Sequence, residues 1–346
     1  MQLGEVDILS RKYMNDRNHF ADTFNYYLYD GQSGIDPNDL SPLDTAEIAV
    51  PYGNGARVPV QKYRDIIKYW KVMTDGKALY AILGIENQAN VHYAMPVKNG
   101  LYDLMNYSRQ VEEARNSYRL KNWKGRNKNK NSRRKSKKII LSPAEYLSGF
   151  RKEDRLIPVI TLVVFFSASE WDGPMSIHEM LCTDDETLLR YVPDYRIHLL
   201  EPYKMGNSDF EKFQTDFGKV LKYIKYSGDK EKLHEITHES DAYKSIDNDS
   251  AVLMNAITGS KLKIKPEEGK VDMCKAIDDM RTESWEAGKE VGITQGITQG
   301  KELGHNEERV ECIQNLMETM KWTATQAMDA LRIPLSERSN YNITVM

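Results

Sequence analysis

Apolar residues recur with helical spacing in several stretches of the chain. Within residues 15–29, Phe20, Phe24, Tyr27 and Leu28 follow the i, i+4, i+7, i+8 pattern that places side chains on one face of a helix. Asp30 and Gly31 then stop the pattern. By the same reasoning, further helices are predicted over residues 101–118, 175–181, 209–226 and 251–258.

Continuous apolar runs of strand length predict a sheet between these helices. Residues 63–72 and 78–85 read as two long strands, and the Asp75-Gly76 dipeptide between them suits a hairpin turn. Residues 156–166 form the most strongly apolar strand of the chain. Such runs are typical of strands covered on both faces. With shorter strands expected at 47–50 and 196–200, the pattern predicts an α/β fold with helices flanking a central sheet.

Glycine recurs every four residues near the C-terminus, at 288, 292, 296, 300 and 304. Because each glycine costs ~1 kcal/mol relative to alanine inside a helix, two interpretations of residues 261–309 stay open. The segment is either a helix whose glycine ridge pairs with a second copy of the chain in a homo-oligomer, or a flexible linker. Residues 310–320 and 323–331 read as two short helices, with Thr323 as an N-cap. We therefore expect a domain over 1–260, this segment, and a small helical part over 310–346.

Composition narrows the function classes only slightly. The 346 residues are 40% hydrophobic and 29% charged, and the formal net charge is −3, so the overall charge gives no indication of nucleic-acid binding. The sequence contains no run of ~18 apolar residues, so no membrane span is expected. Its first residues lack the pattern of a secretory signal. The three cysteines are far apart and form no Cys-x-x-Cys motif. We therefore expect a protein of the reducing cytoplasm that has no disulfide framework.

Two carboxylates carry the candidate chemistry. Asp65 lies ten residues before Asp75, and Glu86 lies ten residues after Gly76, so a hairpin turn at 75–76 would place them opposite each other. Mg²⁺ favours one or two carboxylates together with water and phosphate oxygens. Asp65 and Glu86 are therefore candidate ligands of Mg²⁺, or of Mn²⁺, and the alternative is a pair of solvated surface acids.

The residues that follow Glu86 extend this candidate site. The backbone carbonyl of Asn87 could complete the metal's ligands, and Gln88, on the same strand face as Glu86, could orient a water molecule but not take its proton. Asp22, between Phe20 and Phe24, is either a further acidic group that reaches the sheet end or an ordinary helix-surface acid.

A strongly basic run follows the helix predicted at 101–118. Residues 119–138 contain eleven Lys or Arg and no Asp or Glu, so this stretch is expected to be disordered. It is either a solubilising insertion or a surface that binds DNA phosphates without reading sequence. The candidate nucleic-acid-binding residues are Lys124, Arg126, Lys128, Lys130, Arg133, Arg134 and Lys135.

Several of these segments resemble the PD-(D/E)XK nuclease family of transposases, also called recombination-promoting nucleases. The resemblance covers most of the chain, and the Glu-x-Gln element after an apolar strand is its most specific part. It is carried by residues 18–25, 63–66, 83–88 and 156–166 and by the glycine-periodic tail with residues 325–334.

The resemblance implies a restriction-endonuclease-like core, a mixed central sheet flanked by helices, with a helical C-terminal extension. It also implies Mg²⁺-dependent cleavage of DNA. Asp65 matches the family's first metal carboxylate, Glu86 the second, and Asp22 the acidic position of the first helix. Gln88 stands where the wider superfamily has lysine, which leaves the general base open. The basic run departs from the shorter members of the family.

The sequence thus predicts a metal-dependent DNA endonuclease. Two hypotheses of other classes remain beside it. The chain is either a catalytically silent DNA-binding or assembly protein that retains the fold, or a regulatory module whose C-terminal helices bind a protein partner.

Overall fold

The chain divides into two compact units. The computed structural model describes residues 3–44, 46–49, 60–63, 65–74, 77–126, 141–239, 241–264 and 269–341. The first unit is Met1–Ile277 and the second is Asp278–Met346. The boundary thus falls after the position expected at residue 260, and the residues expected as a linker and as a separate C-terminal part belong largely to one unit.

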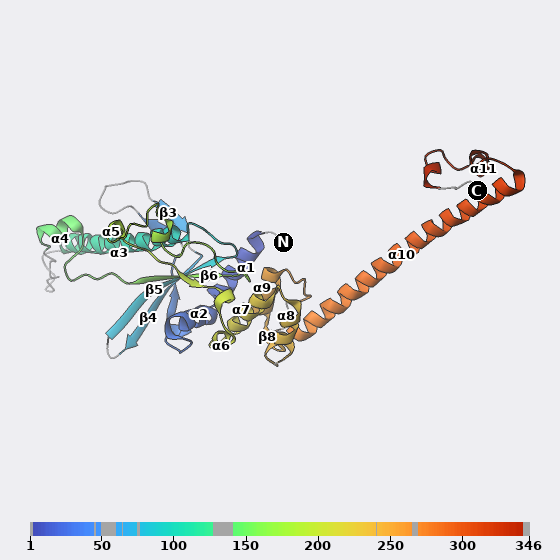
Figure 1. The fold of residues 1–346 in the computed structure, drawn as a ribbon. Coiled ribbons are helices and arrows are strands. Elements are labelled where there is room, and N and C mark those ends of the chain that lie inside the picture. Colours follow the sequence, from blue (N-terminus) through green and yellow to red (C-terminus); the bar gives the residue numbers. More distant parts are fainter. Residues whose placement is uncertain are drawn as a thin grey trace. The chain divides into compact units, whose positions relative to one another are not determined.

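A mixed sheet of five strands lies at the centre of the first unit (Figure 1). Its order is β1-β4-β5-β6-β7. The pairs β1–β4 and β4–β5 are antiparallel, whereas the pairs β5–β6 and β6–β7 are parallel. This confirms the predicted α/β class. The strands are β1 (Leu40–Pro42), β4 (Ile66–Thr74), β5 (Lys77–Gln88), β6 (Val159–Phe165) and β7 (His198–Leu200). Two small antiparallel pairs lie outside it: β2 (Ala46–Ala49) with β3 (Val60–Tyr63), and β8 (Ile246–Asp247) with β9 (Lys270–Val271).

The predicted hairpin is present in the register that the sequence indicated. Thr74 pairs with Lys77, and Ile66 pairs with Ile85 at the far end of the ladder. The turn residues 75–76 lie outside the described residues. Because this ladder continues without a shift along all of β4, the residue before Ile66 lies opposite the residue after Ile85.

Helices cover both faces of the sheet, and alternation along the strands decides which residues meet which helix. On one face, Tyr107 and Asp103 of α3 bond to Val159 and Thr161 of β6. On the other face, Lys68 of β4 reaches the junction of the first two helices. The helices of the first unit are α1 (Leu3–Asn15), α2 (Arg17–Tyr29), α3 (Met95–Arg126), α4 (Pro143–Ser148), α5 (Glu186–Leu189), α6 (Asn207–Phe210), α7 (Phe217–Tyr226), α8 (Lys230–His238) and α9 (Asn248–Thr258).

The N-terminal helix α1 was not predicted from the sequence. Asp16 caps α2 by accepting hydrogen bonds from the backbone N–H groups of Asn18 and His19, so α2 starts at Arg17. The residues before Asp16 form a separate helix, with Tyr13 and Met14 buried. Short 3₁₀ helices complete the first unit at Pro37–Asp39 (η1), His178–Met180 (η2), Pro202–Lys204 (η3) and Asp241–Tyr243 (η4).

The second unit is helical. The glycine-periodic segment lies within one continuous helix, α10 (Met273–Met320), which begins in the first unit. A capping box between Thr323 and Gln326 starts α11 (Ala324–Ala330), as the sequence predicted. The short 3₁₀ helix η5 (Arg338–Asn340) follows. A small core joins these elements through Ile313, Ala327, Met328, Ile333 and Tyr341.

The described helices include none that is both long and apolar enough to span a membrane. The three cysteines are thiols that form no disulfide within the described residues; Cys274 is buried, and Cys182 and Cys312 are exposed.

Candidate active site

Asp65 lies at the start of β4, at the edge where the antiparallel and parallel parts of the sheet meet. Its Oδ2 accepts a hydrogen bond of 2.9 Å from the backbone N–H of Asn87. This bond ties Asp65 to the end of β5, so Asp65 and Glu86 lie opposite each other as the hairpin count predicted. Opposed residues of an antiparallel pair share one face of the sheet, about 5 Å apart at Cβ.

Glu86 is fully buried at the end of β5, on the sheet face covered by α3. Lys98, in the first turns of α3, lies across from it, with 2.8 Å between Lys98 Nζ and Glu86 Oε2. The Glu86 side chain is 1% exposed and that of Lys98 is 27% exposed. Burying a carboxylate this deeply is costly unless it is paired, and the ammonium of Lys98 is its paired cation.

The pKa values show that Lys98 acts on both carboxylates. Burial raises the pKa of Asp65, while the hydrogen bond from Asn87, the guanidinium of Arg11 and the ammonium of Lys98 lower it. Burial also lowers the pKa of Lys98, but Glu86, with a smaller contribution from Asp65, raises it above its ordinary value overall. Lys98 is therefore a protonated cation at neutral pH, paired with Glu86 and close enough to Asp65 to lower its pKa.

Helix α1 contributes two further charged side chains that the sequence reasoning missed. Arg11 Nη2 lies 2.8 Å from Asp65 Oδ1 and 3.4 Å from Asp7 Oδ2. Asp7 in turn raises the pKa of Asp65. The helical spacing of Leu9, Tyr13 and Met14 was the signal that could have revealed α1, and with it this pair.

Asp22 has a different environment from the one expected. It is buried on α2, and its carboxylate accepts hydrogen bonds from the backbone N–H of Gln214 at 2.9 Å and from the N–H and hydroxyl of Thr215 at 2.8 and 2.6 Å. These bonds fix the segment that leads into α7. The contacts of Asp22 are thus those of a structural cap, and the helix acid beside Asp65 is Asp7.

Asn87 and Gln88 lie on opposite faces of β5. The Asn87 side chain faces away from Glu86, and its buried amide atoms have no hydrogen-bond partner among the residues that the structure describes. Gln88 is half-buried on the same face as Glu86, and its carbonyl accepts a hydrogen bond from the N–H of Phe166. The face shared by Gln88 and Glu86 agrees with the prediction that an amide stands next to the second carboxylate.

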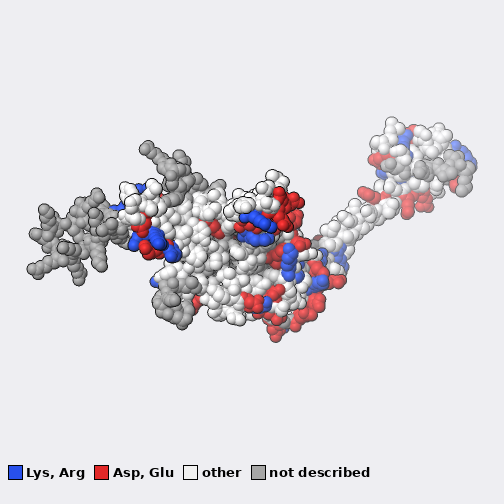
Figure 2. All heavy atoms as spheres, turned by 60° about the vertical axis from the view of Figure 1, so that its left-hand side comes forward, with Lys and Arg blue, Asp and Glu red and all other residues white. Residues whose placement is uncertain are grey.

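The candidate nucleic-acid-binding residues lie mostly outside the described part of the chain. Helix α3 continues through Arg126, so Lys124 and Arg126 belong to it, although their side chains are not described. Lys128, Lys130, Arg133, Arg134 and Lys135 lie outside the described residues. On the face drawn in Figure 2, the described acidic and basic side chains are interspersed and form no large patch of one sign.

The donor set at Asp65 and Glu86 fits a hard divalent cation. Two carboxylates face the same edge of the sheet, and both are held by hydrogen bonds or ion pairs within the chain. Oxygen ligands of this kind suit Mg²⁺ or Mn²⁺ and not a soft metal.

Comparisons with known protein families, with curated proteins and with solved structures gave no match to this chain.

Proposed function

We propose that this protein is a metal-dependent DNA endonuclease that hydrolyses phosphodiester bonds at the site formed by Asp65, Glu86 and Lys98. The observation that carries the proposal is the meeting of three groups from separate elements at one edge of the sheet. Two are carboxylates on neighbouring strands, and the third is a half-buried lysine on the following helix.

The order of elements supports a restriction-endonuclease-like core. An antiparallel hairpin, β4 and β5, is followed by the long helix α3 and then by β6, which is parallel to β5. The candidate acids lie at the start of β4 and the end of β5, the positions indicated by the family resemblance.

The local charge supports a divalent cation and an anionic substrate. Among the side chains that the structure describes here, three carboxylates (Asp7, Asp65 and Glu86) pair with two cations (Arg11 and Lys98), which is a formal excess of one negative charge. A bound Mg²⁺ would reverse this sign and would favour a phosphodiester, which carries one negative charge.

Each side chain has a distinct role in this proposal. Asp65 and Glu86 would hold Mg²⁺ or Mn²⁺, which when bound polarises the scissile phosphate and acidifies an attacking water. Lys98, protonated at neutral pH, would donate hydrogen bonds to phosphate oxygens and stabilise the charge that develops on them. Gln88 would orient the attacking water. Water adds to phosphorus and gives up one proton to solvent, the P–O bond to the leaving oxygen breaks, and that oxygen takes up a proton from solvent.

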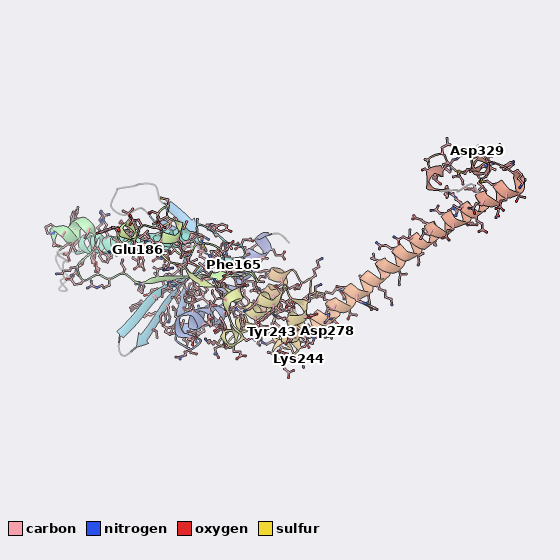
Figure 3. All side chains as sticks on the ribbon, viewed as in Figure 1. Phe165, Glu186, Tyr243, Lys244, Asp278 and Asp329 are labelled. Carbon is pink, nitrogen blue, oxygen red and sulfur yellow. The ribbon has the colours of Figure 1, made fainter. Side chains whose placement is uncertain are left out.

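The test is nicking of supercoiled plasmid by the purified full chain in Mg²⁺ or Mn²⁺. We expect cleavage that chelation abolishes, and loss of at least 100-fold in rate for Asp65→Asn, Glu86→Gln and Lys98→Met, as is common when one preorganised charged group is removed. The matched control is Glu186→Gln, an exposed acid on α5 labelled in Figure 3, which should cleave at the wild-type rate. Equal rates for the wild type and the three site variants would refute the assignment.

One observation favours a second function. Asp65 and Glu86 each carry an ion pair with a cation of the same chain, so their charges are compensated without a metal. A catalytically silent DNA-binding protein would retain this arrangement. DNA binding that survives Glu86→Gln, with no cleavage in either metal at low salt, would establish this second function.

A further inference from the structure

Two histidines on α8 lie one helical turn apart, far along the chain from the proposed nuclease site. His234 and His238 occupy positions i and i+4, so their side chains share one face of the helix. Their rings stack with centroids 3.9 Å apart and planes inclined by 9°. Each ring offers a nitrogen, and these nitrogens lie within 4.8 Å of each other. We propose that His234 and His238 form a bidentate chelate for a transition-metal dication such as Zn²⁺.

Hydrogen bonds set the tautomer that a metal requires. His238 Nδ1 lies 2.9 Å from the carbonyl oxygen of His234, and a carbonyl can only accept, so Nδ1 carries the proton. The hydroxyl of Thr237 donates to the carbonyl oxygen of Leu233 at 2.8 Å or of His234 at 3.0 Å. A lone pair of the same hydroxyl oxygen faces His238 Nδ1 at 3.1 Å. The lone pair of His238 is therefore on Nε2. Histidines that bind metals usually donate their other ring N–H to such an acceptor.

The turn that carries the two histidines is anchored to the rest of the first unit. Thr237 is fully buried and Ile236 is 9% exposed, whereas His234 and His238 are only partly buried. The thiol of Cys274, in the first turn of α10, donates to the carbonyl oxygen of Thr237 at 2.6 Å. Since the backbone is held and the rings remain accessible, little conformational freedom is lost when an ion binds.

The ligand chemistry separates this site from the one at Asp65. Imidazole nitrogens suit Zn²⁺, Co²⁺, Ni²⁺ and Cu²⁺, whereas Mg²⁺ takes oxygen ligands. Two histidines at i and i+4 on a helix are the spacing that zinc enzymes use for two of their ligands. The bound ion would hold the last turn of α8 in its present form.

The experiment is calorimetric titration of the full chain with ZnCl₂ in a large excess of Mg²⁺, which keeps the oxygen site saturated. We expect one equivalent of Zn²⁺ to bind, and His234→Gln and His238→Gln each to weaken this binding at least tenfold. Glutamine retains helix propensity, and circular dichroism will confirm that each variant is folded. The control His305→Gln, an exposed histidine of α10, should bind as the wild type does.

A second measurement uses the wild-type chain alone. Zn²⁺ should slow modification of His234 and His238 by diethylpyrocarbonate at least tenfold, as read by mass spectrometry, while His305 is modified at an unchanged rate. Unchanged modification of His234 and His238, or wild-type Zn²⁺ affinity in both glutamine variants, would overturn the proposal. Glu86→Gln should retain this binding, so the outcome is independent of the proposed nuclease function.

Discussion

Replacing Lys98 by methionine is the most direct test of the candidate site, because it removes the charge and retains most of the side-chain volume. The Glu86 carboxylate would remain in place with 1% of its side chain exposed, and the ammonium 2.8 Å away would be gone. Water cannot replace that cation at so buried a position. Lys98→Met should therefore destabilise the first unit and also abolish the proposed cleavage.

The expected loss follows from the burial of the pair. Removing one partner of a buried ion pair costs about 3–5 kcal/mol. Lys98 keeps 27% of its side chain in contact with solvent, which places the effect at the lower end, about 3 kcal/mol. A loss of this size lowers the folding equilibrium constant by about 100-fold. With a urea dependence of about 3 kcal/mol per molar, the unfolding midpoint should fall by about 1 M.

The assay is urea unfolding of the full chain, followed by tryptophan fluorescence. The control is Lys244→Met, which removes an exposed lysine paired with exposed Asp241 and labelled in Figure 3; it should leave the midpoint unchanged. The double variant Glu86→Gln/Lys98→Met should recover a large part of the stability, because no buried charge is left alone. The reasoning is refuted if Lys98→Met shifts the midpoint no more than Lys244→Met does.

Three further outcomes are expected. Asp65→Asn should raise the melting temperature at pH 7 and not at pH 4. Burial raises the folded-state pKa of Asp65 above its unfolded value of about 3.9. The stability that this carboxyl contributes is therefore complete below the unfolded pKa and is lost as pH rises through the folded pKa. A variant that melts below the wild type at pH 7 would contradict this sign. Asp22→Asn should destabilise the fold by about 1–3 kcal/mol, since an amide nitrogen would meet the N–H groups of the 214–215 segment, while the Mg²⁺ dependence of nicking stays unchanged. Gly296→Ala should stabilise α10 by about 1 kcal/mol in thermal melts followed by circular dichroism, because no atom of the described residues lies within 4 Å of the added methyl group. Destabilisation together with loss of a dimer in sedimentation would instead mean that a second copy packs on the glycine row.

Local sequence predicted the sheet edge that carries the candidate acids. Counting from the Asp75-Gly76 turn placed Asp65 opposite Glu86, and the pairing of Ile66 with Ile85 has this register. The count succeeds because a hairpin register is set by its turn, and both strands are long and apolar. The burial of Glu86 also follows from its place after a run of apolar residues.

The cations of the site were not predictable from local patterns. Lys98 follows a loop after β5, and only the packing of α3 on the sheet brings its ammonium to Glu86. The partners of Asp22 were likewise not predictable from local sequence. Its position between two phenylalanines indicates burial, but a buried carboxylate can face either a metal or backbone N–H groups, and the distant segment at 214–215 decided between them.

The same contacts explain why this edge of the sheet is both costly and useful. Asp65 and Glu86 are held in an environment that raises the pKa of Asp65 and leaves Glu86 almost no water, so the fold would be more stable with neutral groups at these positions. Two helices that approach from opposite faces, α1 with Arg11 and α3 with Lys98, offset part of that cost. A purely structural ion pair would need one acid and one base, whereas the described side chains at this strand end include three acids and two bases. Such an excess is expected where a divalent cation completes the charge balance. For this reason Asp65→Asn should raise the stability of the fold and lower the rate of cleavage.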